Sequence, residues 1–350
     1  MDVQDDICTS LKKIQNKSLK NYNTFGINAL ARCFYEVSSI SEIRTLIKKR
    51  VFSSKYLVLG GGSNMLLTQD FEGSVIKINL SGITILKEAD NFVEVEFAAG
   101  ENWHQCVLFC INNNWGGIEN LSLIPGNVGA APIQNIGAYG VEIKDLLVQV
   151  HAIGLRDGEE LTFANSDCEF GYRSSIFKEK LKGSHIVTSV VLRLSKSPNH
   201  RLNLDYGDIR TQLSQSEISN PTISDVSRAV ISIRSSKLPD PSELGNSGSF
   251  FKNPLVPPTE IERLLANFPE LRWFKVDEMH CKLAAGWLIE QCGWKGKRVG
   301  NVGSHSKQAL VLVNYGQAKG QEVLELARQI IDSVYNKFEI KLEAEVNIIT

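Results

Sequence analysis

"GGIENLSLIPGNVGAAPIQNIGAYG", residues 116–140, decides how the fold is interpreted, because most of it follows neither a helical nor a strand period. Two prolines and several glycines and asparagines lie among isoleucine, leucine and valine. Loops of this length without regular structure are uncommon inside compact domains and usually carry function. The main-chain amides of such a loop can lie against a flat polar ring, as a flavin requires. We therefore expect residues 116–140 to line a ligand site.

A second glycine-rich segment, "LGGGSN" at residues 59–64, follows the buried apolar run that begins at residue 56. Exposed main-chain amides after a strand can form a nest for a phosphate. The segment matches neither the P-loop, which needs GxxxxGK[ST], nor the dinucleotide fingerprint, because Met65 stands where a third glycine should be. A phosphate site and an ordinary tight turn both stay open.

Elsewhere in the chain, helical and strand patterns alternate irregularly, which predicts an α+β fold and not an even βαβ array. Helical spacing predicts helices over 38–50, 101–115, 222–239, 259–268, 283–293 and 322–338. Strand patterns lie at 34–37, 56–67, 75–78, 92–100, 146–155, 185–194, 308–314 and 339–349. Thr259 and Glu262 have the spacing of a capping box. A polar, weakly periodic stretch near 200–222 is a plausible domain boundary.

Composition narrows the classes of function. The 350 residues carry a formal net charge of −1, so no broad basic field marks the chain for nucleic acid or a membrane surface. The seven cysteines lie far apart with no CxxC pair, and the six histidines are scattered. We therefore expect neither a disulfide framework nor a metal site, and we expect a reducing, cytoplasmic location. The sequence shows no signal peptide and no run of 18 apolar residues.

Three polar residues lie in patterns that have both an ordinary and a functional interpretation. Ser249 in "NSGSFFKNP" (246–254) belongs either to a surface turn or to a loop whose two phenylalanines hold the hydroxyl in place. Arg173 in "FGYRSS" (170–175) is either a surface residue or a two-pronged donor for a carboxylate. Glu345 lies on the polar face of the alternating segment 339–349, which either contacts water or lines a cavity.

The segments "NTFGI", "LGGGSN", "LIPGNVGAAPIQNIGAYG", "FGYRSSIFK", "SSKLPDP", "NSGSFFKNP", "KLAAGWLIEQCG" and "EAEV" occur in this order. With them the chain resembles the UDP-N-acetylenolpyruvoylglucosamine reductase family from about residue 20 to residue 349. The resemblance implies a PCMH-type FAD-binding domain over 20–215. It also implies a smaller C-terminal α+β substrate-binding domain over 216–350, whose last strand returns to the active site. It further implies NADPH-dependent reduction of UDP-N-acetylglucosamine enolpyruvate to UDP-N-acetylmuramate, in peptidoglycan precursor synthesis. We expect a monomer, although the sequence does not give the oligomeric state.

The resemblance also implies roles for individual residues. Arg173 would stabilise the developing enolate with Glu345 beside it, which could also donate a proton if it is protonated, and Ser249 would be the proton donor. Non-covalent FAD would be bound by Gly60, Gly61, Gly62, Ser63, Asn64, Pro125, Gly126, Gln134, Asn135, Gly137 and Ala138. The substrate would be bound by Tyr172, Tyr206, Lys237, Asn253 and Gln308. "LDYGD" resembles the subgroup in which a tyrosine-bearing loop folds over the substrate.

The departures from the family's pattern are small. Ala344 stands where many members have proline, Ser247 stands where alanine is common, and "GNVGAA" replaces a frequent cysteine and serine pair. No separate dinucleotide fingerprint is present, so we expect NADPH to enter the channel of the substrate. Two rivals remain: a PCMH-type flavin oxidase acting on a sugar or alcohol, and a flavin- or nucleotide-binding module without catalysis.

Overall fold

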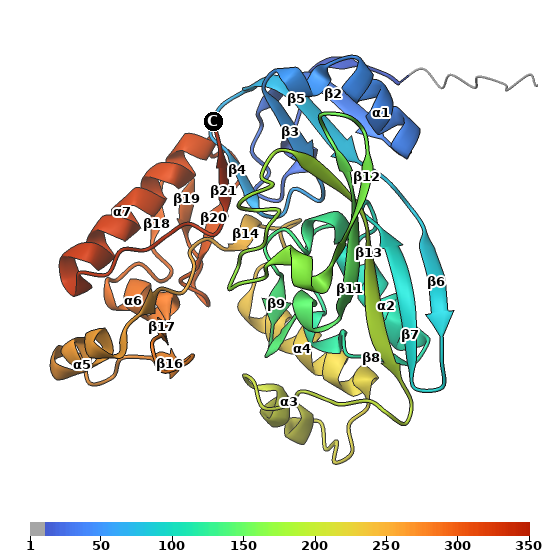
Figure 1. The fold of residues 1–350 in the computed structure, drawn as a ribbon. Helices are drawn as coiled ribbons and strands as arrows, with labels where there is room; N and C mark the ends of the chain where they lie inside the picture. The colour runs from blue at the N-terminus through green and yellow to red at the C-terminus, as the bar shows by residue number, and fades with distance from the viewer. Residues whose placement is uncertain (1–10) are drawn as a thin grey trace, which may run out of the picture.

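The structure is a computed structural model that describes residues 11–350. Its N-terminal part is a sheet with strand order β1-β2-β5-β3, in which β2 and β3 run parallel to β5 (Figure 1). The elements are β1 Ile14–Ser18, η1 Lys20–Tyr22, β2 Leu30–Val37, α1 Ile40–Lys48, η2 Val51–Ser53, β3 Tyr56–Leu59, β4 Met65–Leu67 and β5 Phe71–Ile78. Ser39 caps α1 by accepting a hydrogen bond from Glu42 N, which confirms the predicted helix.

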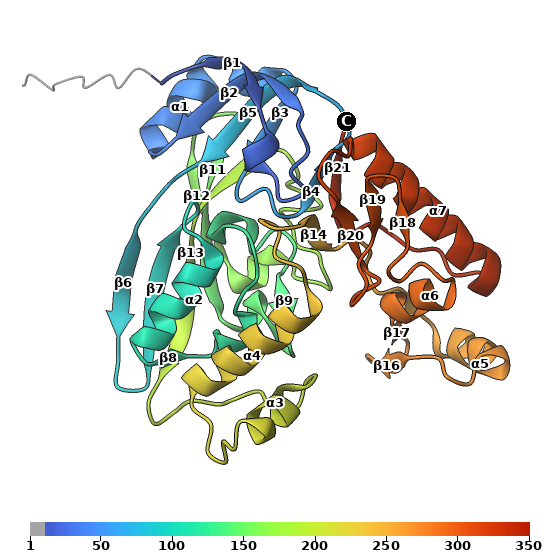
Figure 2. The same cartoon turned by 180° about the vertical axis from the view of Figure 1, so that it is seen from behind.

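A second sheet follows, with strand order β12-β11-β13-β7-β6 and β8 paired with β13. Its elements are β6 Ile83–Glu88, β7 Phe92–Ala98, α2 Trp103–Asn112, β8 Trp115–Gly116, β11 Leu147–Gly154, β12 Glu160–Ala164, η6 Asn165–Cys168 and β13 His185–Lys196. Figure 2 shows α2 lying against this sheet. Trp103, Cys106 and Val107 of α2 are buried in one cluster with Val95 and Val190 of the strands. The apolar face predicted for this helix therefore forms core.

The long loop predicted at 116–140 contains only short turns and two-residue strands. Within it lie η3 Glu119–Leu121, η4 Val128–Ala130 and β9 Gly137–Ala138, and β10 Val141–Glu142 and η5 Ile143–Asp145 follow directly after it. Two helices lie beside this loop, α3 Ile209–Gln215 and α4 Ile223–Lys237. They pack on each other through an apolar cluster, and α4 also contacts η3. The helix predicted over 222–239 is thus confirmed, whereas the predicted domain boundary after residue 215 stays a prediction.

The rest of the chain forms a separate lobe in Figures 1 and 2. Its elements are β14 Gly245–Ser249, β15 Leu255–Val256, α5 Pro258–Asn267, β16 Trp273–Lys275, β17 Cys281–Leu283, α6 Ala285–Gln291, β18 Arg298–Val299, β19 Val302–Ser304, β20 Val311–Asn314, α7 Gly320–Phe338 and β21 Asn347–Ile349. The strands form two sheets, β14-β20-β19-β18 and β15-β17-β16. Strand β21 returns to the first part of the chain and pairs in parallel with β4. One apolar cluster joins both parts, so they share a core.

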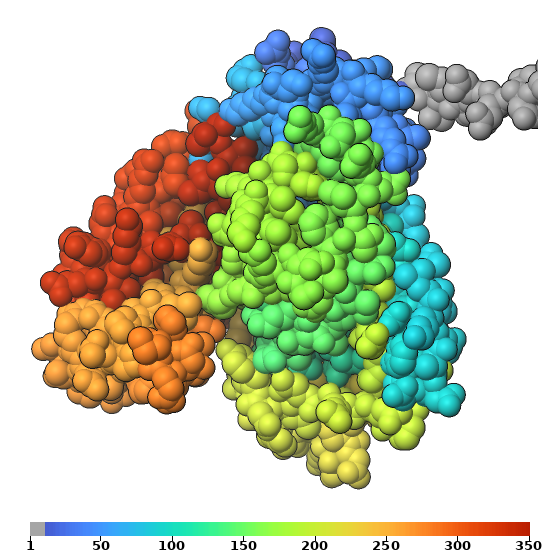
Figure 3. Space-filling view, viewed as in Figure 1, coloured from blue at the N-terminus to red at the C-terminus, as the bar shows by residue number. Residues whose placement is uncertain are grey.

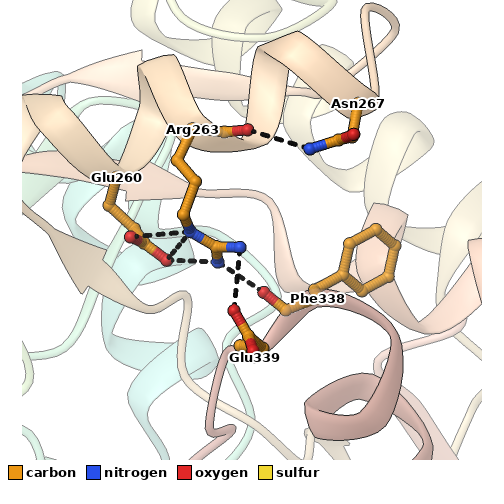
Figure 4. Close-up of polar contacts among 5 residues, drawn as sticks. All are labelled: Glu260, Arg263, Asn267, Phe338 and Glu339. Carbon is orange, nitrogen blue, oxygen red and sulfur yellow. Dashed lines mark hydrogen bonds and ion pairs between the residues drawn. The ribbon is translucent and has the colours of Figure 1, made fainter.

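Arg263 fixes the point where the chain leaves α7 and turns toward β21 (Figure 4). Its guanidinium donates to Phe338 O at 2.7 Å and to Glu339 Oε2 at 3.0 Å, and it also pairs with Glu260 of α5. Phe338 is the last residue of the helix, and Glu339 has a left-handed backbone with φ 60°. A cation at a helix C-terminus meets the negative end of the helix dipole. The contacts therefore stabilise the end of α7 and direct the next segment toward the centre of the molecule.

Two predictions about local structure were wrong in detail. Helix α5 begins at Pro258 with Pro257 as its N-cap, so Thr259 lies inside the helix and caps nothing. Proline suits a first helical position because its missing N–H has no partner there in any helix. The segment predicted as a strand over 339–349 is a strand only at 347–349. Before that it makes an isolated bridge between Ala344 and Phe251, because its neighbour there is a loop and not a sheet edge.

Figure 3 shows a notch between the orange part of the C-terminal lobe and the yellow-green segment that includes α3. Within residues 11–350, the structure contains no helix both long and apolar enough to span a bilayer.

Candidate active site

Ser249 and Glu345 become neighbours through main-chain pairing. Glu345 N donates to Phe250 O at 2.8 Å, and Lys252 N donates to Glu343 O at 2.9 Å. Ser249 ends β14 after a bulge in the pairing with β20, and Gly248 before it has φ 66°, a backbone that favours glycine. The hydroxyl therefore lies at the rim of a sheet, beside the segment that carries the carboxylate.

Phe250 and Phe251 anchor this segment in the core. Each side chain is about 1% exposed, and their rings meet edge to face with centroids 5.1 Å apart. The ring of Phe250 also lies 6.3 Å from that of Phe25. Burying an aromatic ring contributes about 1.5–3 kcal/mol. The interpretation in which the two rings hold the hydroxyl in place therefore holds, and the surface-turn alternative does not.

Arg173 reaches the same place from a tight turn in which Gly171 and Ser174 exchange main-chain hydrogen bonds. Its Nε donates to Glu345 Oε1 at 2.9 Å, and its Nη2 donates to Gly137 O at 3.1 Å. The backbone of Arg173 is left-handed, with φ 55°, which costs a non-glycine residue about 1–2 kcal/mol. A strained backbone that aims a guanidinium at a partly buried carboxylate is typical of functional sites.

The three side chains line one cavity of about 230 Å³. Its wall consists of Ser63, Asn64, Trp103, Ile124, Pro125, Gly126, Asn127, Ala130, Ala131, Gln134, Ile136, Gly137, Tyr172, Arg173, Arg234, Leu238, Ser247, Gly248, Ser249, Phe251, Asn253, Leu310 and Glu345. Both glycine-rich segments singled out in the sequence therefore contribute to the cavity that holds the three polar residues.

The two glycine-rich segments contact each other through their backbones. A Cβ atom on Gly61 would lie 2.7 Å from Gly126 Cα, and one on Gly126 would lie 2.7 Å from Ser63 Oγ. Ser63 Oγ donates to Pro125 O at 3.0 Å, and Asn64 Nδ2 donates to Gln134 Oε1 at 2.7 Å. Glycines and a serine thus form the contact between the two segments. Main-chain groups and the side-chain amides of Asn64 and Gln134 are left to meet a ligand.

Arg234, from the last turn of α4, adds a cation to this wall. Across residues 11–350, its Nε and His305 Nδ1 are the buried side-chain nitrogen or oxygen atoms that lack a hydrogen-bond partner. Burial lowers the pKa of Arg234. An unpaired buried donor costs about 1–3 kcal/mol unless a ligand accepts from it. A ligand with a phosphate or carbonyl oxygen near Arg234 would satisfy this donor.

Comparison with known proteins decides the family. A UDP-N-acetylenolpyruvoylglucosamine reductase from Flavobacterium johnsoniae is 55% identical over 334 residues, which are 95% of this chain and 98% of that protein. The protein of the same name from Chromobacterium violaceum is 49% identical over 93% of this chain and 96% of its own length. The chain belongs to the UDP-N-acetylenolpyruvoylglucosamine reductase family.

Two family models and two solved structures agree with this membership. A UDP-N-acetylenolpyruvoylglucosamine reductase C-terminal domain matches residues 240–349, and an FAD binding domain matches residues 31–164. The crystal structure of the reductase from Thermus caldophilus has a TM-score of 0.68 and 25% identity, over 97% of this chain and 99% of that one. A solvent-stable cholesterol oxidase, 9% identical with a TM-score of 0.50 over 97% and 88%, shares the fold alone.

These findings confirm the predicted family, the α+β fold class with its FAD-binding domain, the FAD cofactor and the class of FAD-dependent oxidoreductase. The wall described above also fits FAD. Gly61 and Gly126 let two backbones approach closely, as a diphosphate nest requires. The unpaired Arg234 and the amide pair of Asn64 and Gln134 are polar groups suited to phosphate oxygens or a flavin ring.

Not all residues predicted to bind the cofactor line the cavity. Ser63, Asn64, Pro125, Gly126, Gln134 and Gly137 do so, whereas Gly60, Gly61, Gly62, Asn135 and Ala138 do not belong to its lining. Gly62 makes room for the chain near Tyr22, since a Cβ there would lie 2.0 Å from Tyr22 O. Asn135 is fully buried and donates to Glu142 and Gly171 O, so it joins the long loop to the turn that carries Arg173.

The predicted substrate residues divide in the same way. Tyr172 and Asn253 line the cavity. Tyr206 lies outside it and is 51% exposed, and Lys237 pairs with Asp208 at 2.5 Å. Gln308 Oε1 accepts from Leu310 N at 3.4 Å, beside the position that a Cβ on Gly286 would take.

Several residues of the cavity wall were not among the predicted site residues, and Arg234 and Ser247 are two polar ones. Arg234 directly follows the apolar position Ile233 of α4, and a long cation beside an apolar helix face was the available signal. Ser247 was noted only as a second hydroxyl near Ser249. Its Oγ lies 3.4 Å from Met65 O and 3.5 Å from Thr24 Oγ1, so it contacts the N-terminal part of the chain.

Proposed function

We propose that this protein reduces the enolpyruvyl double bond of UDP-N-acetylenolpyruvoylglucosamine, giving UDP-N-acetylmuramate for peptidoglycan precursor synthesis. NADPH would be the reductant and FAD the cofactor. The observation that carries the proposal is the meeting of Arg173, Ser249 and Glu345 in one cavity whose other wall consists of the two glycine-rich segments. Relatives that are 45–55% identical over nearly the whole chain carry the reductase name.

When bound, FAD supplies the two-electron chemistry that adds hydride to C3 of the enolpyruvyl group. Negative charge then develops at C2 and on the carboxylate of the substrate. The residues of this chain must therefore bind that carboxylate, stabilise its charge and protonate C2.

Arg173 would bind the carboxylate. Its planar guanidinium has five N–H donors, of which one contacts Glu345 and one contacts Gly137 O. Two partners hold the group before the substrate arrives, so little reorganisation accompanies the reaction. A fixed donor aimed at developing charge lowers the activation barrier by about 3–4 kcal/mol.

Glu345 would act on the same charge by orienting Arg173. Its Oε1 accepts a hydrogen bond from Arg173 Nε at 2.9 Å, so the carboxylate fixes the direction of the guanidinium. Proton donation by Glu345 is the second role considered for it and stays a prediction.

Ser249 would deliver the proton to C2. A hydroxyl is a weak acid, so this role needs a strongly basic carbon and a fixed geometry. The buried rings of Phe250 and Phe251 and the main-chain bond from Glu345 to Phe250 supply that rigidity.

The uridine diphosphate end of the substrate would bind where the C-terminal lobe meets α4. Tyr172 and Asn253 lie at the inner cavity, and Lys237 ends α4. Tyr206 precedes Asp208, the partner of Lys237, by two residues, so both predicted ligands lie on one connected surface. Tyr206 and Gln308 would complete the site when the substrate is bound.

The test uses the flavin spectrum of the purified protein. We expect a yellow protein that NADPH bleaches and that recovers its colour without oxygen only when the enolpyruvyl substrate is added. Recovery with oxygen alone at a comparable rate would support a flavin oxidase, and failure to bleach would support a binding module. Parallel initial-rate lines are expected, because one shared channel implies a ping-pong order. The monomeric state and the cytoplasmic location stay predictions.

A further inference from the structure

The end of the "FGYRSSIFK" motif has no role in the proposed function, yet its last residue contacts the catalytic turn. Lys178 Nζ donates a hydrogen bond to Arg173 O at 2.8 Å. The side chain thus folds back over the turn that carries the guanidinium. Its partner is a main-chain carbonyl and not solvent, which is an unusual position for a half-buried ammonium group.

The turn needs such support because its geometry is unfavourable in isolation. Arg173 has a left-handed backbone with φ 55°, and such a residue persists only where its surroundings hold it. On one side, Gly171 and Ser174 close the turn. On the other side, Ser175 Oγ donates to Ile133 O at 2.7 Å, and Phe177 is buried. Lys178 follows Phe177 directly, so its backbone is fixed while its side chain spans the loop.

We propose that Lys178 is a positioning residue for the reduction. Its ammonium group holds the carbonyl of Arg173, so that the guanidinium keeps its contacts with Glu345 and Gly137 O. The inference rests on the proposed function, in which Arg173 binds the substrate carboxylate. Lys178 acts through Arg173 and contacts neither cofactor nor substrate.

The surroundings of Lys178 suit this role. Burial lowers the pKa of Lys178, and the nearby Lys252 lowers it further. Glu345 acts in the opposite direction and favours the charged form. A charged donor makes a shorter and stronger hydrogen bond to a carbonyl than a neutral one. Lys178 therefore also places a second cation near the carboxylate that orients Arg173.

Lys180 provides a matched control two residues farther along the chain. Its ammonium group pairs with Glu169 at 2.6 Å, and its side chain is 67% exposed. It has the same length and charge as Lys178 but does not contact the catalytic turn. Substitution of Lys180 therefore tests the effect of removing a lysine from this segment without altering the support of Arg173.

The experiment measures the two half-reactions of the FAD-loaded protein separately by stopped-flow absorbance. In Lys178→Met we expect flavin reoxidation by the enolpyruvyl substrate to slow about 10- to 100-fold, as a misplaced catalytic group does. Flavin reduction by NADPH and the KM for the substrate should change less than threefold. Lys178→Arg should recover most of the rate, since arginine can donate to the same carbonyl, and Lys180→Met should match the wild type.

A second comparison isolates the connection to Arg173. In an Arg173→Ala background, Lys178→Met should cause no further loss, because residues that act as a unit are not additive. Multiplicative losses in the double variant, or equal slowing of both half-reactions in Lys178→Met, would overturn the inference. So would a wild-type reoxidation rate in Lys178→Met. Wild-type protein that the substrate fails to reoxidise would overturn the proposed function itself, and the inference with it.

Discussion

The two walls of the cavity are built in opposite ways. The wall of Ser63, Asn64, Gly126 and Gln134 comes from two glycine-rich segments whose backbones touch each other. The facing wall depends on charged and hydroxyl side chains, because Arg173, Ser249 and Glu345 come from a turn, the end of a strand and an irregular segment. The first wall meets its ligand with main-chain and amide groups, and the second with three individual side chains.

This difference predicts opposite sensitivities. On the glycine wall, an added Cβ atom at Gly61 or Gly126 should be harmful, and side-chain identity should matter mainly at the amides of Asn64 and Gln134. On the catalytic wall, side-chain identity should matter most, and backbone space should be less critical. Asn64 connects the two walls, because its Nδ2 lies 3.4 Å from Glu345 O and its own carbonyl accepts from Asn347 N at 3.2 Å. Asn347 Nδ2 also donates to the Asn64 carbonyl at 2.9 Å, so main-chain and side-chain bonds together hold the C-terminal segment against the glycine wall.

The largest effect is expected from Ser249→Ala. Removal of the proton donor should slow flavin reoxidation by the substrate about 10²- to 10⁴-fold, the range of general acid catalysis. Flavin reduction by NADPH should be unaffected, and stopped-flow absorbance measures both steps. Ser247→Ala should slow reoxidation at least tenfold less, because the Ser247 hydroxyl contacts Met65 O and Thr24. A wild-type reoxidation rate in Ser249→Ala would contradict its role.

Arg173→Lys should lower turnover by about 10²- to 10³-fold, as removal of one preorganised donor does. A lysine at this position has one ammonium group and cannot contact Glu345, Gly137 O and the substrate carboxylate in one plane. Steady-state kcat is the measurement.

The control for this variant is Arg193→Lys. Arg193 also pairs with a glutamate, Glu94 at 2.6 Å, but it lies on β13 and is 56% exposed. Equal losses in both variants would mean that any arginine–glutamate pair affects turnover, and the special role of Arg173 would be wrong.

Much of the glycine wall was predictable from the sequence, because each of its two loops is one continuous stretch of the chain. The aperiodic run at 116–140 was predicted to line a ligand site. The turn at 59–64 was a candidate phosphate site, with an ordinary tight turn as the alternative. What the sequence could not give was their mutual contact, since Gly61 and Gly126 meet only in the folded chain. Asn135 illustrates the limit, because its amide is completely buried and joins two loops.

The catalytic wall was recognised through family motifs, whereas periodicity left each of its residues undecided. Alternation placed Glu345 on the polar face of its segment but could not tell solvent from a cavity. The deciding contact is the main-chain bond from Glu345 to Phe250, which joins an irregular segment to the end of β14. Arg234 was missed because its lack of a partner is a property of the folded interior.

Gly61→Ala tests the glycine wall directly. A Cβ there would lie 2.7 Å from Gly126 Cα, so the two backbones must separate, at a cost of about 1–3 kcal/mol. We expect the affinity for FAD to fall about tenfold or more, measured by flavin fluorescence on titration of the apoprotein. Gly60→Ala is the matched control, because the nearest atom to its Cβ would be 3.7 Å away. Equal FAD affinity in the two variants would show that close backbone approach is unimportant.

The smallest effect is expected from Lys237→Ala, at the outer edge of the catalytic wall. Its ammonium group pairs with Asp208 in the same loop as Tyr206, and its side chain is half exposed. It would bind the diphosphate in the ground state and the transition state alike. Loss of such uniform binding raises KM, by about tenfold for one charged hydrogen bond, and leaves kcat nearly unchanged. Lys196→Ala, on β13, removes a comparable pair with Glu88 of β6 and should alter neither constant. A large fall in kcat at constant KM would place Lys237 at the reacting atoms, and the division between a binding edge and a catalytic centre would be lost.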